Sequence, residues 1–363
     1  MRKIGKVICF SVVSLLLLCL NRRIDAARLA VEITFPNLVE YMEWETVELP
    51  ITAEAEKTMV ENGENGEEFA WENEAEFREQ LAEEKQLSFE TLLEEEETSQ
   101  AALPEETFEA VYTQEQLHDY DFLISRIYNV DASTKTNPGQ LDVEKLMSLD
   151  FRVEKETQGP QILIYHTHSQ EAFADSIPGD EATSIVGMGS YLTSLLQQQG
   201  FIVIHHKESF DLVNGELDRN KAYTRAEPAI RQILEENPDI QLVIDLHRDG
   251  VGENVHLVKE IEGKSTAQVM FFNGLSHSAK NGNIEYLSNP YLENNLGLTL
   301  QMKLASDQLF PGFARKIYLK SLRFNLHLHP GAMLIEAGAQ TNTVEEMRNA
   351  MEVLAQVLAD VLY

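Results

Sequence analysis

The sequence predicts an α/β fold with a parallel or mixed sheet flanked by helices. Three apolar runs of four or five residues, Ile162–Tyr165, Leu242–Leu246 and Ala332–Ile335, are typical of buried parallel strands. Segments with helical spacing of apolar residues separate these runs, and this alternation is typical of α/β domains. Each run is followed directly by a histidine or a glutamate, and in open α/β sheets the ligand site lies beyond the carboxyl ends of the strands. We therefore expect one functional site at the edge where these strands end.

The elements of this domain follow in chain order from residue 159. The expected strands are Gln161–Tyr165, Phe201–Ile204, Leu242–Leu246, Val269–Phe272 and Ala332–Glu336. The expected helices cover residues 185–196, 228–234 and 292–309, and a last helix begins at Thr343 with the spacing of a capping box and runs toward Tyr363. Residues 112–158 are expected to form a lead-in segment that packs against the domain 159–363.

The N-terminal residues have the pattern of an export signal or a membrane anchor. Basic residues precede the apolar run Val7–Leu20, which is shorter than the about 20 residues of a usual spanning helix. Arg22 and Arg23 follow the run directly, which favours a retained anchor, and residues 1–25 are assigned to it. Both cysteines of the chain lie within this run, so disulfides and cysteine-based catalysis are excluded for the folded part.

The negative charge of the chain is concentrated ahead of the predicted domain. The formal net charge is −31, and residues 54–109 carry 20 acidic and 3 basic side chains. Such a composition cannot bury enough apolar surface to order itself, so residues 26–111 are expected to be an acidic, largely disordered linker. The charge also argues against nucleic acid as a partner.

Five side chains near the strand ends have the chemistry of a metal-dependent hydrolase: His166, His168, Glu171, His247 and Glu336. A catalytic zinc takes three protein ligands and leaves one position for water. Ligation by His168, Glu171 and His247 leaves Glu336 as the general base. His166 is an alternative to His168 as a ligand, or a neighbouring hydrogen-bond donor or substrate contact. If the first strand continues, both histidines share one face.

Other polar residues near these strand ends have a functional and a structural interpretation. Asp245 lies two residues before His247 on the same strand face, so it can accept a hydrogen bond within the site. Arg248 suits a substrate carboxylate, or an ion pair with Asp245 or Asp249. Capping and packing explain Asn220, Tyr223 and Arg225 about as well as substrate contact does. The competing histidines for a metal are His327 and His329, which precede the last strand and so lie at the wrong end of the sheet, and His205 and His206 at the end of the second strand.

With these residues identified, the chain resembles the stage II sporulation protein P family, whose catalytic domain is similar to the zinc-dependent N-acetylmuramoyl-L-alanine amidases. The resemblance covers residues 119–363 and rests on the stretches ILIYHTHSQEAF, GSYLTSLLQQQGF, NPDIQLVIDLHRDG, AQVMFFNG and AMLIEAGAQTNTVEEM. It implies zinc as the cofactor and Glu336 as the catalytic glutamate. It also favours His168 over His166, because the first histidine ligand of that group lies three residues beyond the end of the strand, as His168 does from Tyr165.

The resemblance also implies an activity, a place and partners. We expect a zinc-dependent peptidoglycan hydrolase that cleaves the amide between N-acetylmuramic acid and L-alanine, and also stem-peptide cross-links, during engulfment of the forespore. The expected partners are the sporulation lytic transglycosylase, stage II sporulation protein D, and a membrane protein that localises both at the outer face of the engulfing septal membrane. The alternatives are another extracytoplasmic zinc hydrolase, such as a peptidase or deacetylase, and a non-catalytic scaffold that binds the cell wall.

Overall fold

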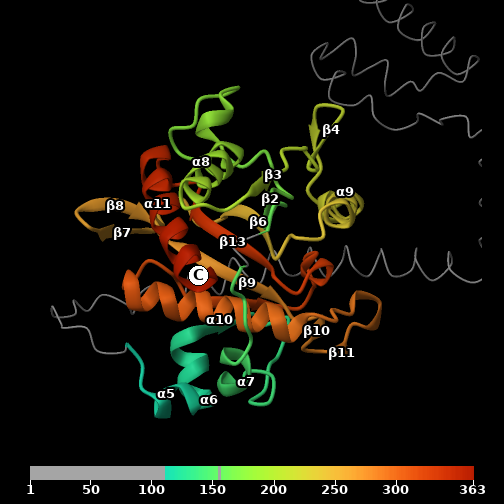
Figure 1. The fold of residues 1–363 in the computed structure, drawn as a ribbon, viewed down its shortest axis with the longest axis vertical. Coiled ribbons are helices and arrows are strands. Elements are labelled where there is room, and N and C mark those ends of the chain that lie inside the picture. The colour runs from blue at the N-terminus through green and yellow to red at the C-terminus, as the bar shows by residue number, and fades with distance from the viewer. Residues whose placement is uncertain (1–110, 154–156) are drawn as a thin grey trace, which may run out of the picture. The chain divides into compact units, whose positions relative to one another are not determined.

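The computed structural model describes residues 111–153 and 157–363 (Figure 1). The expected membrane anchor and nearly all of the expected acidic linker lie outside these residues. Within the described ranges, no helix is both long enough and apolar enough to cross a membrane.

A seven-stranded mixed sheet forms the centre of the domain, with the strand order β1-β12-β9-β13-β6-β2-β3. The strands are β1 (Tyr128–Val130), β2 (Ile162–Tyr165), β3 (Val203–His205), β6 (Leu242–Asp249), β9 (Val269–Gly274), β12 (Ile317–Lys320) and β13 (Ala332–Ala339). Neighbouring strands run parallel except β9 and β13, which are antiparallel. The predicted α/β class is therefore confirmed. The strand β12 was not predicted, and the lead-in segment supplies β1 as an edge strand of the same sheet.

Helices and small hairpins surround this sheet. The helices are α5 (Gln114–His118), α6 (Tyr120–Phe122), α7 (Val143–Met147), α8 (Ile185–Gln198), α9 (Ala222–Glu236), α10 (Leu292–Leu309) and α11 (Val344–Leu362). The hairpins are β4 (Leu212–Val213) with β5 (Glu216–Leu217), β7 (Val258–Ile261) with β8 (Lys264–Ala267), and β10 (His277–Ser278) with β11 (Gly282–Asn283). The capping box of Thr343 and Glu346 at the start of α11 is confirmed.

The start of α9 differs from the prediction. The sequence pattern predicted a helix over residues 228–234. It begins instead at Ala222, and Pro228 lies inside it. The extra turns matter for the site, because they place Tyr223, Thr224 and Glu227 over the sheet.

The two faces of the sheet bury different cores. Alternate residues of a strand point to opposite faces. Leu242, Ile244 and Leu246 of β6 therefore pack into the larger core, which also contains apolar residues of α8, α10 and α11. Val243 faces the smaller core, which contains residues of α9. Figure 1 shows α11 and α9 on opposite sides of the sheet. The same alternation puts Asp245 and His247 on the α9 face.

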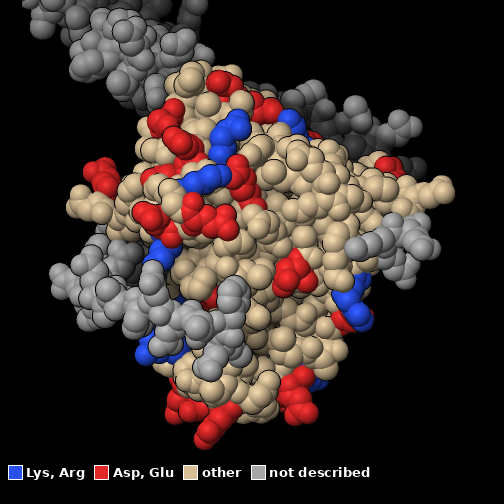
Figure 2. Space-filling view, turned by 60° about the vertical axis from the view of Figure 1, so that its left-hand side comes forward, with Lys and Arg blue, Asp and Glu red and all other residues tan. Residues whose placement is uncertain are grey.

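Charged side chains on the surface link neighbouring elements. Figure 2 shows acidic side chains spread over one face, with fewer basic ones between them. Lys264 of β8 lies 2.6 Å from Glu352 of α11, and Lys207 lies 2.7 Å from Glu181. Exposed pairs of this kind each contribute only about 0–1 kcal/mol. The fold therefore depends on the two cores rather than on these ion pairs.

Candidate functional site

Two neighbouring strands deliver His247 and Glu336 side by side. Glu336 of β13 pairs in register with His247 of β6. Adjacent strands lie about 4.8 Å apart, and residues in register in a parallel pair project from the same face. Both side chains therefore face the layer of α9, and His247 is only 2% exposed. The sheet itself, rather than a loop, fixes the distance between these two groups.

The turn after β2 brings His168 and Glu171 to the same place. Thr167 donates its backbone N–H (2.9 Å) and its hydroxyl (2.5 Å) to the carboxylate of Asp245, which ties the turn to β6. Nδ1 of His168 lies 3.6 Å from Oε1 of Glu171, and Nδ1 of His247 lies 3.8 Å from Oε2 of Glu171. The two imidazole rings meet edge to face, with centroids 4.9 Å apart.

These three side chains have the donor set and spacing to hold a divalent cation. One ligand atom from each of His168, Glu171 and His247 lies within 4.8 Å of the others. In a tetrahedral zinc site with ligand distances of about 2.0–2.1 Å, ligand atoms are about 3.3 Å apart. The separations of 3.6 and 3.8 Å need only small movements to reach that value. Nε2 of His168 is buried without a hydrogen-bond partner among the described residues, which is unusual for a purely structural histidine.

The charge of His247 is balanced by three carboxylates. Burial lowers the pKa of His247, but the negative charges of Asp245, Glu171 and Glu336 outweigh burial and raise its pKa to about 10. Oδ1 of Asp245 lies 2.8 Å from Nε2 of His247, although the N–H is not directed along that line as a hydrogen bond requires. Without a cation, the proton on His247 supplies positive charge to this acidic cluster. A cation that binds through this ring must displace the proton.

Glu336 has the environment of a proton-transfer group. Burial raises the pKa of Glu336 to about 8, and the positive charge of His247 opposes that rise. Its Oε2 is buried and has no hydrogen-bond partner in the described part of the chain. A carboxyl group that exchanges a proton near neutral pH can act as a general acid and base.

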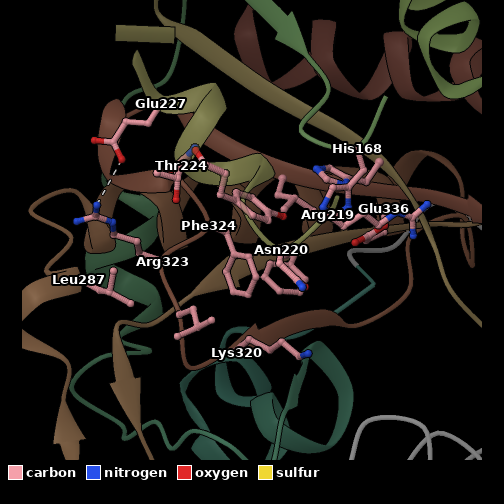
Figure 3. Close-up of a pocket in the computed structure, with 16 residues that line it drawn as sticks. His168, Arg219, Asn220, Thr224, Glu227, Leu287, Lys320, Arg323, Phe324 and Glu336 are labelled. Atoms are coloured by element: carbon pink, nitrogen blue, oxygen red, sulfur yellow. Dashed lines mark hydrogen bonds and ion pairs between the residues drawn. The ribbon is translucent and has the colours of Figure 1, made fainter. Parts of the chain in front are cut away.

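The cluster lies at one end of a cavity of about 310 Å³ (Figure 3). His168 and Glu336 are at one end in this view, and Glu227 and Arg323 are at the other. Between the two ends, Phe324 packs edge to face against Tyr223, with centroids 5.5 Å apart. The cavity therefore extends well beyond the proposed metal ligands.

His166 does not join the cluster. Its Nδ1 donates to the carbonyl of Leu246 (2.7 Å), so its Nε2 accepts from Nε2–H of His205 (2.8 Å). Burial lowers the pKa of His166 to about 4 and that of His205 to about 3, so both rings are neutral. The strand does not continue as a shared face of His166 and His168 would require, because β2 ends at Tyr165 and the chain turns at once.

Arg248 holds backbone groups around the site. Its backbone N–H donates to Oε2 of Glu171 (2.8 Å), and its Nε donates to the carbonyl of Ala172 (2.9 Å). Arg248 is not among the residues that line the cavity. Asp249, which was considered as its ion-pair partner, lies 2.6 Å from Arg315 instead. These contacts suit a role in holding the turn that carries Glu171.

The polar stretch before α9 divides into two roles. Asn220 and Tyr223 line the cavity, and so does Arg219, which the sequence analysis did not single out. Arg225 donates to the carbonyls of Phe210 and Asp218 and therefore holds a loop. A lone arginine in a polar stretch gives no sequence signal that separates these roles.

The competing histidines lie outside the cluster. Their contacts are His327 Nε2 with Glu227 (3.3 Å), His329 Nδ1 with the N–H of Gly331 (3.0 Å) and His206 Nε2 with Glu208 (3.2 Å).

Two solved structures that resemble the chain are amidases with low sequence identity. N-acetylmuramoyl-L-alanine amidase AmiC2 of Nostoc punctiforme is 15% identical, and the alignment covers 57% of this chain and 97% of that chain with a TM-score of 0.32. The catalytic domain of the N-acetylmuramoyl-L-alanine amidase CwlV from Bacillus (Paenibacillus) polymyxa var. colistinus is 14% identical, with 55% and 95% covered and a TM-score of 0.29. At such low TM-scores, these two structures establish neither the activity nor the site residues of this chain.

The sequence comparisons are more specific. Stage II sporulation protein P of Bacillus subtilis (strain 168) is 24% identical over 226 residues, which are 58% of this chain and 53% of the relative. The chain thus matches about half the length of this relative. The family model described as Stage II sporulation protein P (SpoIIP) matches residues 40–359, which is most of the chain. The predicted resemblance is confirmed, and the chain belongs to the stage II sporulation protein P family.

Proposed function

We propose that the chain is a zinc-dependent peptidoglycan hydrolase that cleaves the amide between N-acetylmuramic acid and L-alanine during sporulation. The observation that carries this proposal is the cluster of His168, Glu171 and His247 beside Glu336, at one end of a cavity. Three ligands and one uncoordinated carboxyl group are what metal-assisted amide hydrolysis requires. Membership of the family supports the sporulation setting and a cell-wall substrate.

The side chains of the cluster divide the chemistry between them. His168, Glu171 and His247 would hold zinc, which supplies a Lewis acid for the amide carbonyl and lowers the pKa of water. Oε2 of Glu336 accepts a proton from the attacking water, and Glu336 then delivers that proton to the nitrogen of the leaving L-alanine. The amide bond is replaced by a lactyl carboxylate and a free amine, so one water molecule is consumed. Asp245 anchors Thr167 and faces His247, which fixes the two histidines relative to each other.

Digestion of purified peptidoglycan tests this function. The protein loaded with zinc is expected to release stem peptides with new L-alanine amino termini, detected by mass spectrometry of labelled amines. Glu336→Gln is expected to lose about 10²–10⁴-fold in rate while it still binds zinc. Glu285→Gln, a change at a glutamate outside the cavity lining, is the matched control and should digest like the wild type.

Other products would favour the alternatives. New amino termini at cross-links alone indicate an endopeptidase, and released acetate indicates a deacetylase. Wall binding without any cleavage, unchanged in Glu336→Gln, would contradict the proposed hydrolase and favour a scaffold. Attachment to the membrane through residues 1–25 and assembly with stage II sporulation protein D and a localising membrane protein remain predictions, which co-purification from sporulating cells would test.

A further inference from the structure

We propose that Arg219 binds a free carboxylate on the peptide side of the scissile amide, and so selects stem peptides with an unmodified acidic residue after L-alanine. This inference rests on the proposed function, because it assigns the substrate group that the far side of the same site recognises. It concerns the first residue beyond the bond that is cleaved.

Arg219 is a cation that faces the site, and it has no ion-pair partner among the residues that the structure describes. It lines the same cavity as His168, His247 and Glu336, and Figure 3 shows it next to His168 and Glu336. Its Nε is buried and has no hydrogen-bond partner, and no acidic side chain in the described ranges forms an ion pair with it. A buried N–H without a hydrogen-bond partner costs free energy of folding, so each such group in a native protein needs an explanation. A bound ligand that accepts the hydrogen bond is one explanation.

The other cationic side chains of the cavity are placed differently. Arg323 lies 3.5 Å from the carboxylate of Glu227 at the far end of the cavity. The ammonium of Lys320 lies 5.9 Å from the centre of the Tyr318 ring. The guanidinium of Arg219 is therefore the better candidate to meet an anionic group close to Glu336.

The backbone of Arg219 is tied to the turn that carries the proposed ligands. Arg225 donates to the carbonyl of Asp218 (3.0 Å), and the N–H of Asp218 donates to the carbonyl of Asp211 (2.8 Å). The carboxylate of Asp211 accepts the N–H of Ser169 (3.1 Å), one residue beyond His168. Because these contacts form a short chain, they hold the backbone of Arg219 in place before substrate binds, which lowers the entropy cost of recognition.

The chemistry of the substrate decides which side Arg219 recognises. Near the scissile amide, the glycan side offers hydroxyl, ether and N-acetyl groups, all of which are uncharged at neutral pH. On the peptide side, L-alanine is followed by D-glutamate linked through its side chain, which leaves its α-carboxylate free. A guanidinium forms paired, charge-assisted hydrogen bonds with such a carboxylate. It also offsets the repulsion that Glu171 and Glu336 exert on an approaching anion.

Two substrates that differ in one group test this inference. They are N-acetylglucosaminyl-N-acetylmuramoyl-L-alanyl-D-glutamate with its side-chain carboxyl group blocked as a methylamide, and the same compound with the α-carboxylate also converted to an amide. With zinc present, the wild type is expected to show a kcat/KM roughly 10- to 100-fold higher for the free acid, the range of a hydrogen bond to a charged group. Arg219→Gln should cleave both compounds at similar, low efficiency, and Arg219→Lys should keep part of the preference. Lys280→Gln, which removes an exposed positive charge outside the cavity lining, should behave like the wild type.

A binding measurement separates recognition from catalysis. In the Glu336→Gln background, calorimetry should show tighter binding of the free acid than of the amide, and Arg219→Gln should remove that difference. A preference for the free acid that survives in Arg219→Gln overturns the role of Arg219 and leaves the proposed function standing. An equal loss for both compounds also overturns it, because a structural defect lowers both. If the wild type cleaves neither compound nor purified peptidoglycan, the proposed function and this inference fall together.

Discussion

Replacing Glu336 with glutamine is expected to stabilise the cation-free protein at about pH 8 and above, although the same change is expected to slow the proposed hydrolysis. Burial raises the pKa of Glu336 from 4.5 to about 8, while the positive charge of His247 opposes the rise. The folded protein therefore keeps this proton at pH values where the unfolded chain has lost it. Because the folded-state pKa is the higher one, the free energy of unfolding falls as pH rises from about 4.5 to about 8.

The size of the effect follows from the two pKa values. At about 1.36 kcal/mol for each pH unit between them, the full cost of ionising Glu336 in the folded protein is at most roughly 5 kcal/mol. Solvent that enters the cavity reduces this cost, so we expect a difference of a few kcal/mol. His247 has a pKa of about 10 in the folded protein and 6.5 when unfolded, so it also lowers stability as pH rises above 6.5. Wild type and variant share this contribution, so the difference between them reports on Glu336. Glutamine has the shape of the neutral carboxyl group, so Glu336→Gln removes the cost without opening a cavity.

Urea unfolding in the presence of a chelator measures this difference. Wild type and Glu336→Gln should have similar stability near pH 4, and the variant should be more stable by a few kcal/mol at about pH 8.5. Glu235→Gln, the same change at an exposed position of α9, is the control and should follow the wild type at both pH values. If Glu336→Gln and the wild type lose stability in parallel as pH rises, Glu336 does not titrate as its surroundings predict, and its assignment as the proton carrier loses its physical basis.

Further changes test the cluster and the fold around it. His168→Ala should lower zinc affinity at least about 10- to 100-fold, whereas His166→Ala should lose stability but keep zinc, and metal analysis after dialysis that found the reverse would overturn the choice of ligand. Asp245→Asn should weaken zinc binding about 10-fold, since it removes the charge that holds the turn after β2, and unchanged affinity in calorimetry would speak against that role. Gly274→Ala should destabilise the protein by more than about 3 kcal/mol, because its Cβ would lie 1.8 Å from the carbonyl of Leu322, and a thermal unfolding midpoint like that of the wild type would contradict this packing.

The strands that carry the site were predictable because both of their faces are buried. Leu242–Leu246 and Ala332–Ile335 are continuous apolar runs, and in the structure nearly every residue of β6 and β13 is buried. The runs therefore predicted the strands that carry His247 and Glu336, although β6 continues to Asp249 and β13 to Ala339, so both residues lie within their strands. β12 was missed because only alternate residues of Ile317–Lys320 are buried. A strand of four residues with only two buried apolar side chains gives too weak an apolar pattern to be recognised in the sequence.

The choice between His166 and His168 could not be made from local sequence. The strand ends at Tyr165 because Thr167 bonds to Asp245, a residue 78 positions further along the chain. Periodicity describes a strand that continues, and it carries no information about such a long-range contact. Arg219 was missed for a related reason, since only the folded chain shows that its Nε is buried without a partner.

The length of the cavity follows from the one antiparallel pair in the sheet. β6 and β13 run toward the end that carries His247 and Glu336, whereas β9 and β12 run the other way. The loop that follows β12 therefore closes the opposite end of the cavity, where Arg323 lies, and the paired residues Leu334 and Phe272 line it between the two ends. In a fully parallel sheet, all of these loops would gather at one edge and form a compact pocket. The reversed strands instead give a cleft that runs along the sheet, which gives the proposed peptidoglycan substrate room to extend from the Glu336 end toward Arg323.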